Sequence, residues 1–510
     1  MNKRSTLGCL GVALAVLAAG CGGEDDPVSD QGSTRANEVK IAVGAEIPDL
    51  DPHASATGPL QLVHWGNVSE TLVAISAEGE PEPLLATSWT QPAGTVLEVE
   101  LRPNVTFHNG DALDADAVVA NFERFFGGRI TPSHLGFFSA YAGIEKVDDM
   151  TVAISLAESD PGFVAKLSFL PMIPPSLLDA GPEALQSSDV GSGPYVLSSV
   201  DEGEIQMTKT DDYWGGETDG PDKVTILSRP EASARLAALR TGEVDIITPL
   251  PPDLVGEAPN VQSSAGGEMV VVSLNGQNGI TVDPRVREAI VLAIDSDGIR
   301  EALLADESQP GRCQFAVEGV AGFNEDLERP EYDPDRAAEL IEEAGVAGQT
   351  VNLLVPTGRF TFAEEAAQVI TDQLTAVGLQ VELQPLDNNT WTDELTQPAT
   401  SRLEMFLFGA SFDSRTVTQP WGAWVNPESA VSAFPHAEYP DLVNDMAVAA
   451  ATPDQEAAAD ALADVSETIC ASNSFVFLYS PDNVYGMVDG VSFPSRLDTR
   501  LPFAQISVTR

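Results

Sequence analysis

The sequence predicts an α/β protein whose folded part is divided into two lobes. Its 510 residues are too many for one hydrophobic core and enough for two or three. From residue 38 onward, stretches that alternate apolar and polar residues, as strands do, are interleaved with stretches of helical periodicity. A helix that ends at a glycine and is followed by a strand recurs in two separate blocks of the chain. This recurrence favours two lobes over one.

The start of the chain is typical of an export signal. Lys3 and Arg4 give a positive beginning, and the apolar run that follows is too short to span a bilayer. The run ends in the letters LAAGC, which resemble the lipobox of bacterial lipoproteins, where cleavage leaves the cysteine as a lipid-modified N-terminus. We expect a lipoprotein signal peptide over residues 1–20 and lipidation at Cys21. The alternative is an ordinary secretory leader with a chance cysteine.

The segment after the leader predicts a tether. Residues 21–37 carry almost no apolar side chains, so they cannot bury enough surface to offset the entropy of ordering. Acyl chains on the cysteine would hold the folded body at a membrane. No later segment has a long uninterrupted apolar run. We therefore expect an exported protein that is lipid-anchored, on the outer face of the cytoplasmic membrane or in the periplasm.

The first half of the folded part predicts strands and one well-marked helix. We expect strands within residues 38–52, 95–110 and 148–158. Asp114 is a plausible N-cap for a helix that follows it. The apolar residues of this helix fall on one face: Val118, Val119, Phe122 and Phe125.

The second half repeats the pattern. A helix closed by Gly242 is followed by a strand over residues 244–247, and a similar unit is closed by Gly378. Two further helices open with Asp-Pro, at Asp283 and Asp333, where aspartate caps and proline fits the first turn. The stretch SAGGEMVVVSLNGQNG, an apolar strand between glycine-rich turns, is a candidate for the seam between the lobes.

Charge and cysteine content narrow the class of protein. With 78 acidic and 26 basic residues the net charge is −52, which makes nucleic acid an improbable partner. The acidic surface is expected to serve solubility, with a weak preference for cationic ligands as the alternative. Cys313 and Cys470 form an even pair in an exported chain, so we expect a disulfide; two buried free thiols are the alternative.

Several stretches resemble one known family. SETLVAISAEGEPEPLLATSW, LRPNVTFHNGDALDADAVVANFER and GSGPYVLSSVDEGEIQMTKTDDYWGG occur in this order and are similar to blocks of the extracellular solute-binding proteins of family 5. DPRVREAIVLAIDSDGI and YDPDRAAELIEEAG resemble the second-lobe helices of that family. The resemblance covers nearly the whole chain, from about residue 38 to residue 510.

The resemblance implies a two-lobed periplasmic-binding-protein-like fold of the class II type, with a hinge between the lobes and an extra domain inserted in the first lobe. The boundaries that we expect follow the chain. The first lobe comprises residues 38–64, an inserted subdomain at 65–186, and residues 187–268. The second lobe covers residues 269–485, and residues 486–510 return to the first lobe.

The resemblance also implies a function, the substrate-binding lipoprotein of an ABC importer. Such a protein captures a peptide-like solute in the cleft between its lobes and delivers it to permease subunits and their ATPases. We expect it to act as a monomer, to bind no cofactor and to catalyse no reaction. Two alternatives stay open. One is the same transport role for a sugar, a nickel chelate or another small molecule; the other is a ligand sensor or chaperone lipoprotein.

The main candidate for ligand binding is Asp413. In MFLFGASFDSR a buried strand over residues 405–408 delivers this aspartate just past its end. Family members that bind peptides resemble this, with an aspartate that pairs with the α-ammonium group of the peptide, and a carboxylate suits that task. Ala410 stands where the family often has tryptophan, and SRTV replaces the usual Tyr-Pro-Asp-Pro. The alternative role for the aspartate is a turn or helix cap.

Other candidates are Phe412 and Arg415 beside this aspartate, and Glu46 in the early loop EIPDLDP, which matches a loop that lines the family's cleft. Aromatic side chains in the second lobe could pack on ligand side chains or equally in the core: Trp391, Trp421 and Trp424. The glycines of the stretch GSGPY are expected to shape a turn.

Catalytic and metal-binding motifs are not found. The sequence has no HExxH, GxSxG, SxxK or P-loop pattern, and its five histidines show no ligand spacing. Cys313 and Cys470 have no CxxC partner, which argues against metal binding or redox catalysis. We therefore predict a binding protein without a metal site of its own.

Overall fold

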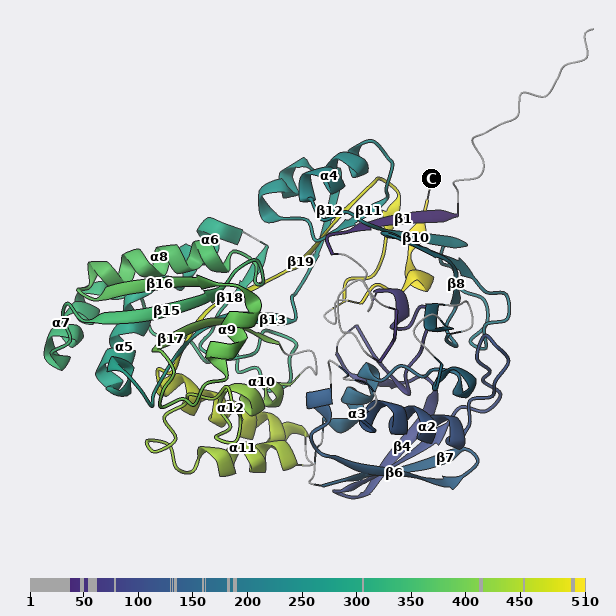
Figure 1. Cartoon of the computed structure of the whole chain (residues 1–510), viewed down its shortest axis with the longest axis horizontal. Helices are drawn as coiled ribbons and strands as arrows, with labels where there is room; N and C mark the ends of the chain where they lie inside the picture. The colour runs from purple at the N-terminus through teal and green to yellow at the C-terminus, as the bar shows by residue number, and fades with distance from the viewer. Residues whose placement is uncertain are drawn as a thin grey trace, which may run out of the picture.

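The computed structural model describes most of the chain from residue 37 to residue 509. The residues between these limits that it does not describe are 46–49, 54–61, 78, 129, 131, 133–134, 158–159, 161, 181–183, 187–189, 305–306, 412–415, 453–454 and 497–499. The described elements form two lobes, each built on its own sheet (Figure 1). Within the described part, no helix has both the length and the apolar character needed to cross a bilayer.

The first lobe is organised by a seven-stranded sheet of order β12-β19-β11-β1-β10-β9-β8. Strand β1 lies in its middle and pairs in parallel with β10 and β11. Helix α4 (Ala232–Arg240) precedes β11 and packs on it. The strands are β1 (Glu38–Val43), β8 (Tyr195–Asp201), β9 (Glu204–Lys209), β10 (Lys223–Ser228), β11 (Ile246–Thr248), β12 (Asn260–Ser264) and β19 (Asn483–Met487).

A separate antiparallel sheet of order β4-β5-β7-β6 lies at the far end of the first lobe (Figure 1). Its strands are β4 (Ala86–Ala93), β5 (Val96–Leu101), β6 (Tyr141–Asp148) and β7 (Thr151–Leu156). Helix α2 (Ala115–Phe126) covers β6 and β7 with the apolar face that its sequence predicts. Asp114 caps this helix as predicted, because its side chain accepts a hydrogen bond from the Ala117 N–H at 2.9 Å.

Short elements connect this sheet to the rest of the first lobe. They are β2 (Val73–Ile75), β3 (Pro81–Pro83), η1 (Leu135–Phe138), α3 (Phe163–Lys166), η2 (Leu167–Phe169), η3 (Pro175–Leu177), η4 (Ala184–Gln186) and η5 (Pro252–Glu257). The end of the chain packs on the same lobe through β20 (Val491–Ser492), η7 (Phe503–Gln505) and β21 (Ser507–Val508).

The second lobe is organised by a six-stranded sheet of order β14-β18-β13-β17-β15-β16. Its strands are β13 (Glu268–Leu274), β14 (Ser308–Pro310), β15 (Thr350–Pro356), β16 (Gln380–Leu386), β17 (Met405–Ser411) and β18 (Phe475–Pro481). Its helices are η6 (Ile280–Val282), α5 (Pro284–Ala293), α6 (Ser296–Leu304), α7 (Pro334–Ala344), α8 (Ala363–Ala376), α9 (Asn388–Leu395), α10 (Thr418–Trp424), α11 (Leu442–Ala451) and α12 (Gln455–Ala471).

The helix caps and the helix-ending glycines that the sequence predicts in the second half of the chain are present in the structure. Asp283 and Asp333 cap α5 and α7, each accepting a backbone N–H at 2.9 Å. Gly242 and Gly378 follow α4 and α8 with φ of 70° and 100°, the left-handed region in which glycine is favoured. The α/β fold class is confirmed.

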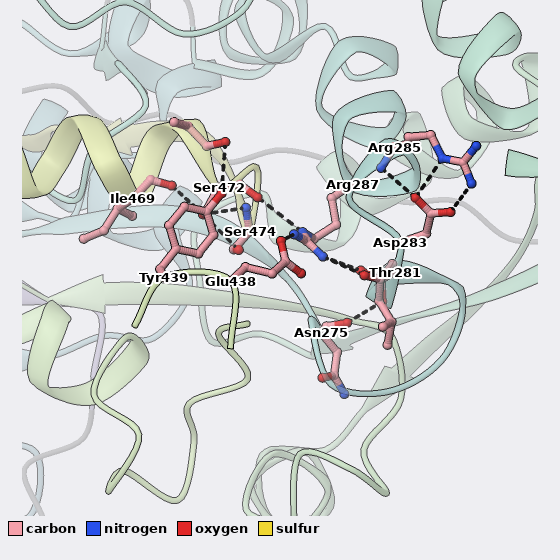
Figure 2. Close-up of polar contacts among 12 residues, drawn as sticks. Asn275, Thr281, Asp283, Arg285, Arg287, Glu438, Tyr439, Ile469, Ser472 and Ser474 are labelled. Carbon is pink, nitrogen blue, oxygen red and sulfur yellow. Dashed lines mark hydrogen bonds and ion pairs between the residues drawn. The ribbon is translucent and has the colours of Figure 1, made fainter. Parts of the chain in front are cut away.

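A buried arginine ties together the end of the second lobe where β13 finishes. Arg287 on α5 is fully buried and donates hydrogen bonds to the carbonyls of Thr281, at 3.1 Å, and Ser472, at 3.2 Å (Figure 2). Its Nη2 also pairs with the Glu438 carboxylate at 2.6 Å. These bonds join α5 to the loop before it, to the segment after α12 and to the loop before α11. They fix segments that are far apart in the sequence.

The same lobe contains a disulfide. The sulfurs of Cys313 and Cys470 are bonded at 2.11 Å and connect the segment after β14 to the end of α12, across 157 residues of chain. A link over such a separation restricts the unfolded chain more than a local one does.

The hydrophobic cores of the two lobes are separate. The core cluster of the second lobe begins at Met269 and ends at Tyr479. The described clusters of the first lobe stop at Val261 and resume at Val484. Because no described residue belongs to both sets, each lobe holds itself together. The lobes can therefore move relative to each other without breaking apolar contacts of either core.

Candidate functional site

Two chain segments join the lobes and lie against each other. One comprises residues 265–267 between β12 and β13, and the other is Asp482 between β18 and β19. At Gly266 an added Cβ would lie 1.9 Å from the carbonyl oxygen of Pro481, so a side chain there would force the two segments apart. Strands β12 and β19 pair antiparallel directly beyond these segments. The two connecting segments therefore form the hinge between the lobes.

Two carboxyl groups, those of Asp482 and Glu307, lie at the hinge. The Asp482 N–H donates to the carbonyl oxygen of Glu307 at 3.1 Å. Ser263 of the first lobe donates its hydroxyl to the carboxylate of Glu307, which belongs to the second lobe. Oδ1 of Asp482 is buried and has no hydrogen-bond partner among the described residues. Burial, and then the charge of Glu307, raise the pKa of Asp482 to about 6. The hinge therefore holds a carboxyl group that titrates in mildly acidic solution.

The sheet of the second lobe turns one edge toward the hinge. β13 starts at Glu268, directly after the first crossing segment, and β17 runs antiparallel to it with Ser411 opposite Glu268. β15 is parallel to both β16 and β17, so the carboxyl ends of these three strands share that edge. Helices α9 and α10 lie on the side of the second lobe that faces the first (Figure 1). Ligands of open α/β sheets bind outside the carboxyl ends of the strands, which makes this edge the candidate site.

Half of the predicted site residues lie outside the described residues. These are the lipidation site and four ligand candidates: Cys21, Glu46, Phe412, Asp413 and Arg415. β17 ends at Ser411, so the segment with Asp413 leaves the carboxyl end of a buried strand, as the sequence predicts. The roles of these residues stay predictions.

The two lobes approach each other at a second place, directly after that segment. A Cβ on Gly162, which precedes α3 in the first lobe, would lie 3.9 Å from Cγ2 of Thr416 in the second lobe. Beside this contact, Lys166 and Asp160 form an ion pair at 2.7 Å with side chains that are only 15% and 16% exposed. Thr416 of the second lobe therefore lies next to the start of α3 in the first lobe. No sequence pattern predicts this contact, because it joins residues that are far apart in the chain.

The three tryptophans that were candidates for ligand contact lie in the core of the second lobe. Trp391 on α9 and Trp421 and Trp424 on α10 are 3%, 1% and 8% exposed. Trp424 stacks on Phe408 of β17, with ring centroids 3.4 Å apart. The observed role of these rings is core packing, and contact with a ligand stays a prediction.

Buried polar contacts hold the residues that follow residues 46–49 in the first lobe. Arg124 on α2 makes two bonds to the carboxylate of Asp51, at 2.7 and 3.1 Å. Burial alone would raise the pKa of Asp51, but the bonds and the charge of Arg124 outweigh it, so the pKa is lowered. His53 contacts the carbonyl oxygen of Pro171 at 2.7 Å, and His64 that of Leu50 at 3.0 Å. Burial is the main reason why the pKa of each imidazole is lowered to about 4.

A buried carboxyl group joins distant loops of the first lobe. Glu70 is 1% exposed and accepts hydrogen bonds from Ser192 Oγ at 2.9 Å, Tyr213 Oη at 2.8 Å and Trp214 Nε1 at 2.6 Å. Burial raises the pKa of Glu70 to about 7, although these donors act in the opposite direction. Sequence reasoning did not single out this residue. The available signal was one acidic residue between Ser69 and Thr71, just before the apolar run of residues 72–75.

The glycines of the stretch GSGPY permit a close approach of two backbones. An added Cβ at Gly191 would lie 1.8 Å from the carbonyl oxygen of Val68, and one at Gly193 would lie 2.2 Å from that of Asn67. Only residues without a side chain fit there, which is more specific than the expected turn. Within the described part of the chain, no group of three or more His, Cys, Asp or Glu side chains is arranged to hold a metal ion.

The sequence model of one family, "Bacterial extracellular solute-binding proteins, family 5 Middle", matches residues 80–429. The chain belongs to this family. This solute-binding protein is 24% identical over 459 residues to the glutathione-binding protein GsiB of Pectobacterium atrosepticum, covering 87% of this chain and 88% of that relative. The family consists of binding proteins rather than enzymes.

Two solved structures show that the fold is that of two-lobed periplasmic binding proteins. The Helicobacter pylori protein DppA, in complex with the peptide STSA, superimposes with a TM-score of 0.75 at 23% identity, covering 93% of this chain and 98% of that one. The Staphylococcus aureus protein NikA, in complex with Ni(L-His)2, superimposes with a TM-score of 0.73 at 17% identity, covering 93% and 100%. The predicted two-lobed fold of this solute-binding protein is confirmed.

Proposed function

We propose that this protein is the solute-capturing lipoprotein of an ABC importer and that it closes its lobes around a peptide-like solute. The observation that carries the proposal is the pair of independent cores joined by two segments that cross at Gly266 and Asp482. A protein built this way changes the distance between its lobes by hinge motion. A relative named for glutathione binding and a structural neighbour in complex with a peptide support a peptide-like solute.

In this proposal the ionic anchor for the solute is Asp413, with Phe412 and Arg415 beside it and Glu46 on the opposite lobe. A carboxylate selects ligands with an ammonium group, because an unpaired charge in a closed cleft costs several kcal/mol. Cys21 carries the lipid anchor, and the monomer delivers its solute to permease subunits. The predicted domain boundaries belong to the same proposal.

A non-peptide solute is the second candidate. The similarity to a protein in complex with a nickel chelate supports it, as does Ala410 in place of the family's frequent tryptophan. A sensor or chaperone lipoprotein is the third possibility, and adjacent permease and ATPase genes would argue against it.

The experiment is native mass spectrometry of the chain from Gly22 onward, purified without refolding and then incubated with a mixed pool of tripeptides. We expect bound masses that fragment as short peptides, and we expect Asp413→Asn to lose them while it stays folded. Asp372→Asn, an exposed aspartate on α8, is the matched control and should retain them. A single bound mass that contains a metal, or retention of sugars and rejection of all peptides, would overturn the peptide proposal.

A further inference from the structure

A long segment of the second lobe contains no helix or strand. It lies between β14, which ends at Pro310, and α7, which begins at Pro334; all residues from 311 to 333 are described, and none of them belongs to a regular element. Irregular segments of this length are uncommon in compact domains and usually have a function of their own. Residues 313–317 are all buried, so the segment is part of the packed lobe rather than a linker on its surface.

The disulfide fastens the start of this segment to α12. Cys313 is bonded to Cys470, which lies in the last turn of α12. Next to it, Gln314 makes two hydrogen bonds with Asn324: its Nε2–H donates to the carbonyl oxygen at 2.7 Å, and its Oε1 accepts the backbone N–H at 2.8 Å. These bonds close residues 314–324 into a loop. The disulfide therefore holds this loop at its base.

The tip of the loop contacts the chain just before α10. Ala321 forms a parallel bridge with Thr416, and its carbonyl oxygen accepts the N–H of Val417 at 3.1 Å. Gly322 has a φ of 87°, and an added Cβ there would lie 2.6 Å from Cγ2 of Val417 and 3.1 Å from Cβ of Leu462 on α12. The tip is therefore packed between α12 and Val417, with no room for a side chain at Gly322.

The path from the disulfide to the contact between the lobes is short and continuous. On α12, Leu462 and Cys470 are eight residues apart, which corresponds to about 12 Å of helix. Thr416, at the end of the path, lies next to Gly162 of the first lobe, and Asp413 precedes it by three residues in the sequence. A displacement of the loop would therefore move residues at the place where the lobes approach each other.

We propose that the bond between Cys313 and Cys470 is a positioning element for solute binding: through loop 314–324 it holds Thr416 and Val417 in the arrangement that captures solute. Without the bond the loop samples other arrangements, and only the fraction of molecules in the competent one binds with full affinity. The disulfide thus sets the affinity for solute in addition to stabilising the lobe. The inference rests on the proposed function and says what controls the same site.

The lobe has a second anchor for the base of the loop. The ring of Phe315 packs edge-on against those of Phe475 and Phe477 on β18, with centroids 4.9 Å apart in both pairs. We therefore expect the double variant Cys313→Ala/Cys470→Ala to melt at a lower temperature but to be folded at room temperature, where the measurements are made.

The first measurement is hydrogen exchange of the solute-free chain from Gly22 onward. In the double variant the Val417 N–H should exchange at least about tenfold faster than in the wild type, because its bond to Ala321 opens more often. Amides of β1 in the first lobe should exchange at an unchanged rate. The second measurement is affinity, by native mass spectrometry with a mixed pool of tripeptides and by calorimetry with the best-retained peptide. The double variant should bind about tenfold more weakly.

Two glycine variants test the path with the disulfide intact. In Gly322→Ala the new methyl group displaces Val417, so the affinity should again fall about tenfold. Gly348→Ala is the matched control, because Gly348 lies in the same lobe with a similar φ of 74°, and nothing lies within 4 Å of an added Cβ. Its affinity should equal that of the wild type. Gly322→Ala combined with the double cysteine variant should lose less than the product of the two separate losses, because both act through the same contact.

A disulfide with a structural role alone would lower the melting temperature of the double cysteine variant and leave its affinity and the exchange of Val417 unchanged. That result would overturn the inference, as would equal affinities for Gly322→Ala and Gly348→Ala, and in both cases the proposed peptide-binding function stands. A wild type that retains no peptide at millimolar concentration overturns both.

Discussion

The interiors of the two lobes contain different kinds of ionisable group. The first lobe buries acids and imidazoles as well as two arginines: Asp51, Glu70, Asp245, His53, His64, Arg124 and Arg235. The second lobe buries two arginines, Arg287 and Arg402. Glu70 and the two imidazoles change charge between about pH 4 and pH 7, because their pKa values are about 7 and about 4, whereas arginine does not change charge in this range.

The second lobe satisfies its buried arginines mostly with backbone carbonyls. Arg402 donates to the carbonyl oxygens of Gln397, Ala430 and Val431 at 2.6–3.1 Å. Burial lowers its pKa to about 10, so it remains charged at neutral pH. The loops that these arginines bridge are therefore held by bonds that mild acid does not alter. We infer that acid acts on the first lobe before the second.

The largest effect is expected from breaking the buried pair in the first lobe. Arg124→Met leaves the Asp51 carboxylate buried without its partner, and this should lower the free energy of unfolding by about 3–5 kcal/mol. The control is Arg285→Met on α5, because that arginine pairs with Asp283 at 2.6 Å but both side chains are partly exposed, 49% and 30%. An exposed pair of this kind contributes about 0–1 kcal/mol. Urea unfolding of both variants measures the difference, and equal shifts would contradict the comparison.

The sequence predicted the parts of this comparison that depend on neighbours in the chain. The caps at Asp114, Asp283 and Asp333 act within one turn of helix, so a short motif is sufficient to find them. The strand that leads to Asp413 was found for the same reason, since a run of buried residues is a local pattern. The family blocks then implied the two lobes, which no local pattern determines.

The rest depends on contacts between distant residues. Arg124 meets Asp51 across 73 residues of sequence, and Ser192 meets Glu70 across 122. Residue type does not distinguish Asp51 or Glu70 from the other acidic residues, because the chain has 78 of them in total. Burial of the tryptophans is also a tertiary property, so the sequence left core packing and ligand contact equally open.

The second effect is a dependence of stability on pH that comes from the first lobe. The pKa of His53 and of His64 is about 4 in the folded protein and 6.5 in the unfolded chain. The unfolded chain therefore binds more protons between these values, and stability is lost as the pH falls from about 6.5 to 4, by up to about 3 kcal/mol for each imidazole. Glu70 acts oppositely, because its pKa of about 7 in the folded protein exceeds the 4.5 of a glutamate in an unfolded chain, so its contribution grows as the pH falls from about 7 to 4.5.

Glu70→Gln and His53→Gln separate these contributions. The glutamate variant should make the loss of stability on acidification steeper, since it removes the opposing group. The histidine variant should make it shallower, and its own amide can replace the donor to Pro171. Melting temperatures between pH 7.5 and pH 4.5 provide the measurement. Curves that run parallel to the wild type would show that these groups do not control the pH dependence.

The smallest effect on stability is expected at the hinge, where the two lobes are joined. The pKa of Asp482 is about 6, above the 3.8 of an aspartate in an unfolded chain, so the ionised side chain destabilises the folded protein at neutral pH. Its contribution is favourable at low pH and is lost as the pH rises through 6. Asp482→Asn should therefore raise stability by about 1 kcal/mol at pH 7.5, a value reduced because the group is partly exposed. The gain should shrink toward zero near pH 4.

Asp482→Asn also separates the hinge from the lobes. The variant should leave the acid sensitivity that comes from His53 and His64 unchanged, because these residues lie in the core of the first lobe rather than at the crossing segments. The exposed Asp372→Asn should change stability at neither pH. If Asp482→Asn stabilised the protein equally at pH 7.5 and pH 4, relief of charge would not be the cause. A new hydrogen bond from the introduced amide to Glu307 would then explain the gain in stability. The stability of the hinge, like that of the second lobe, would not depend on pH in this range.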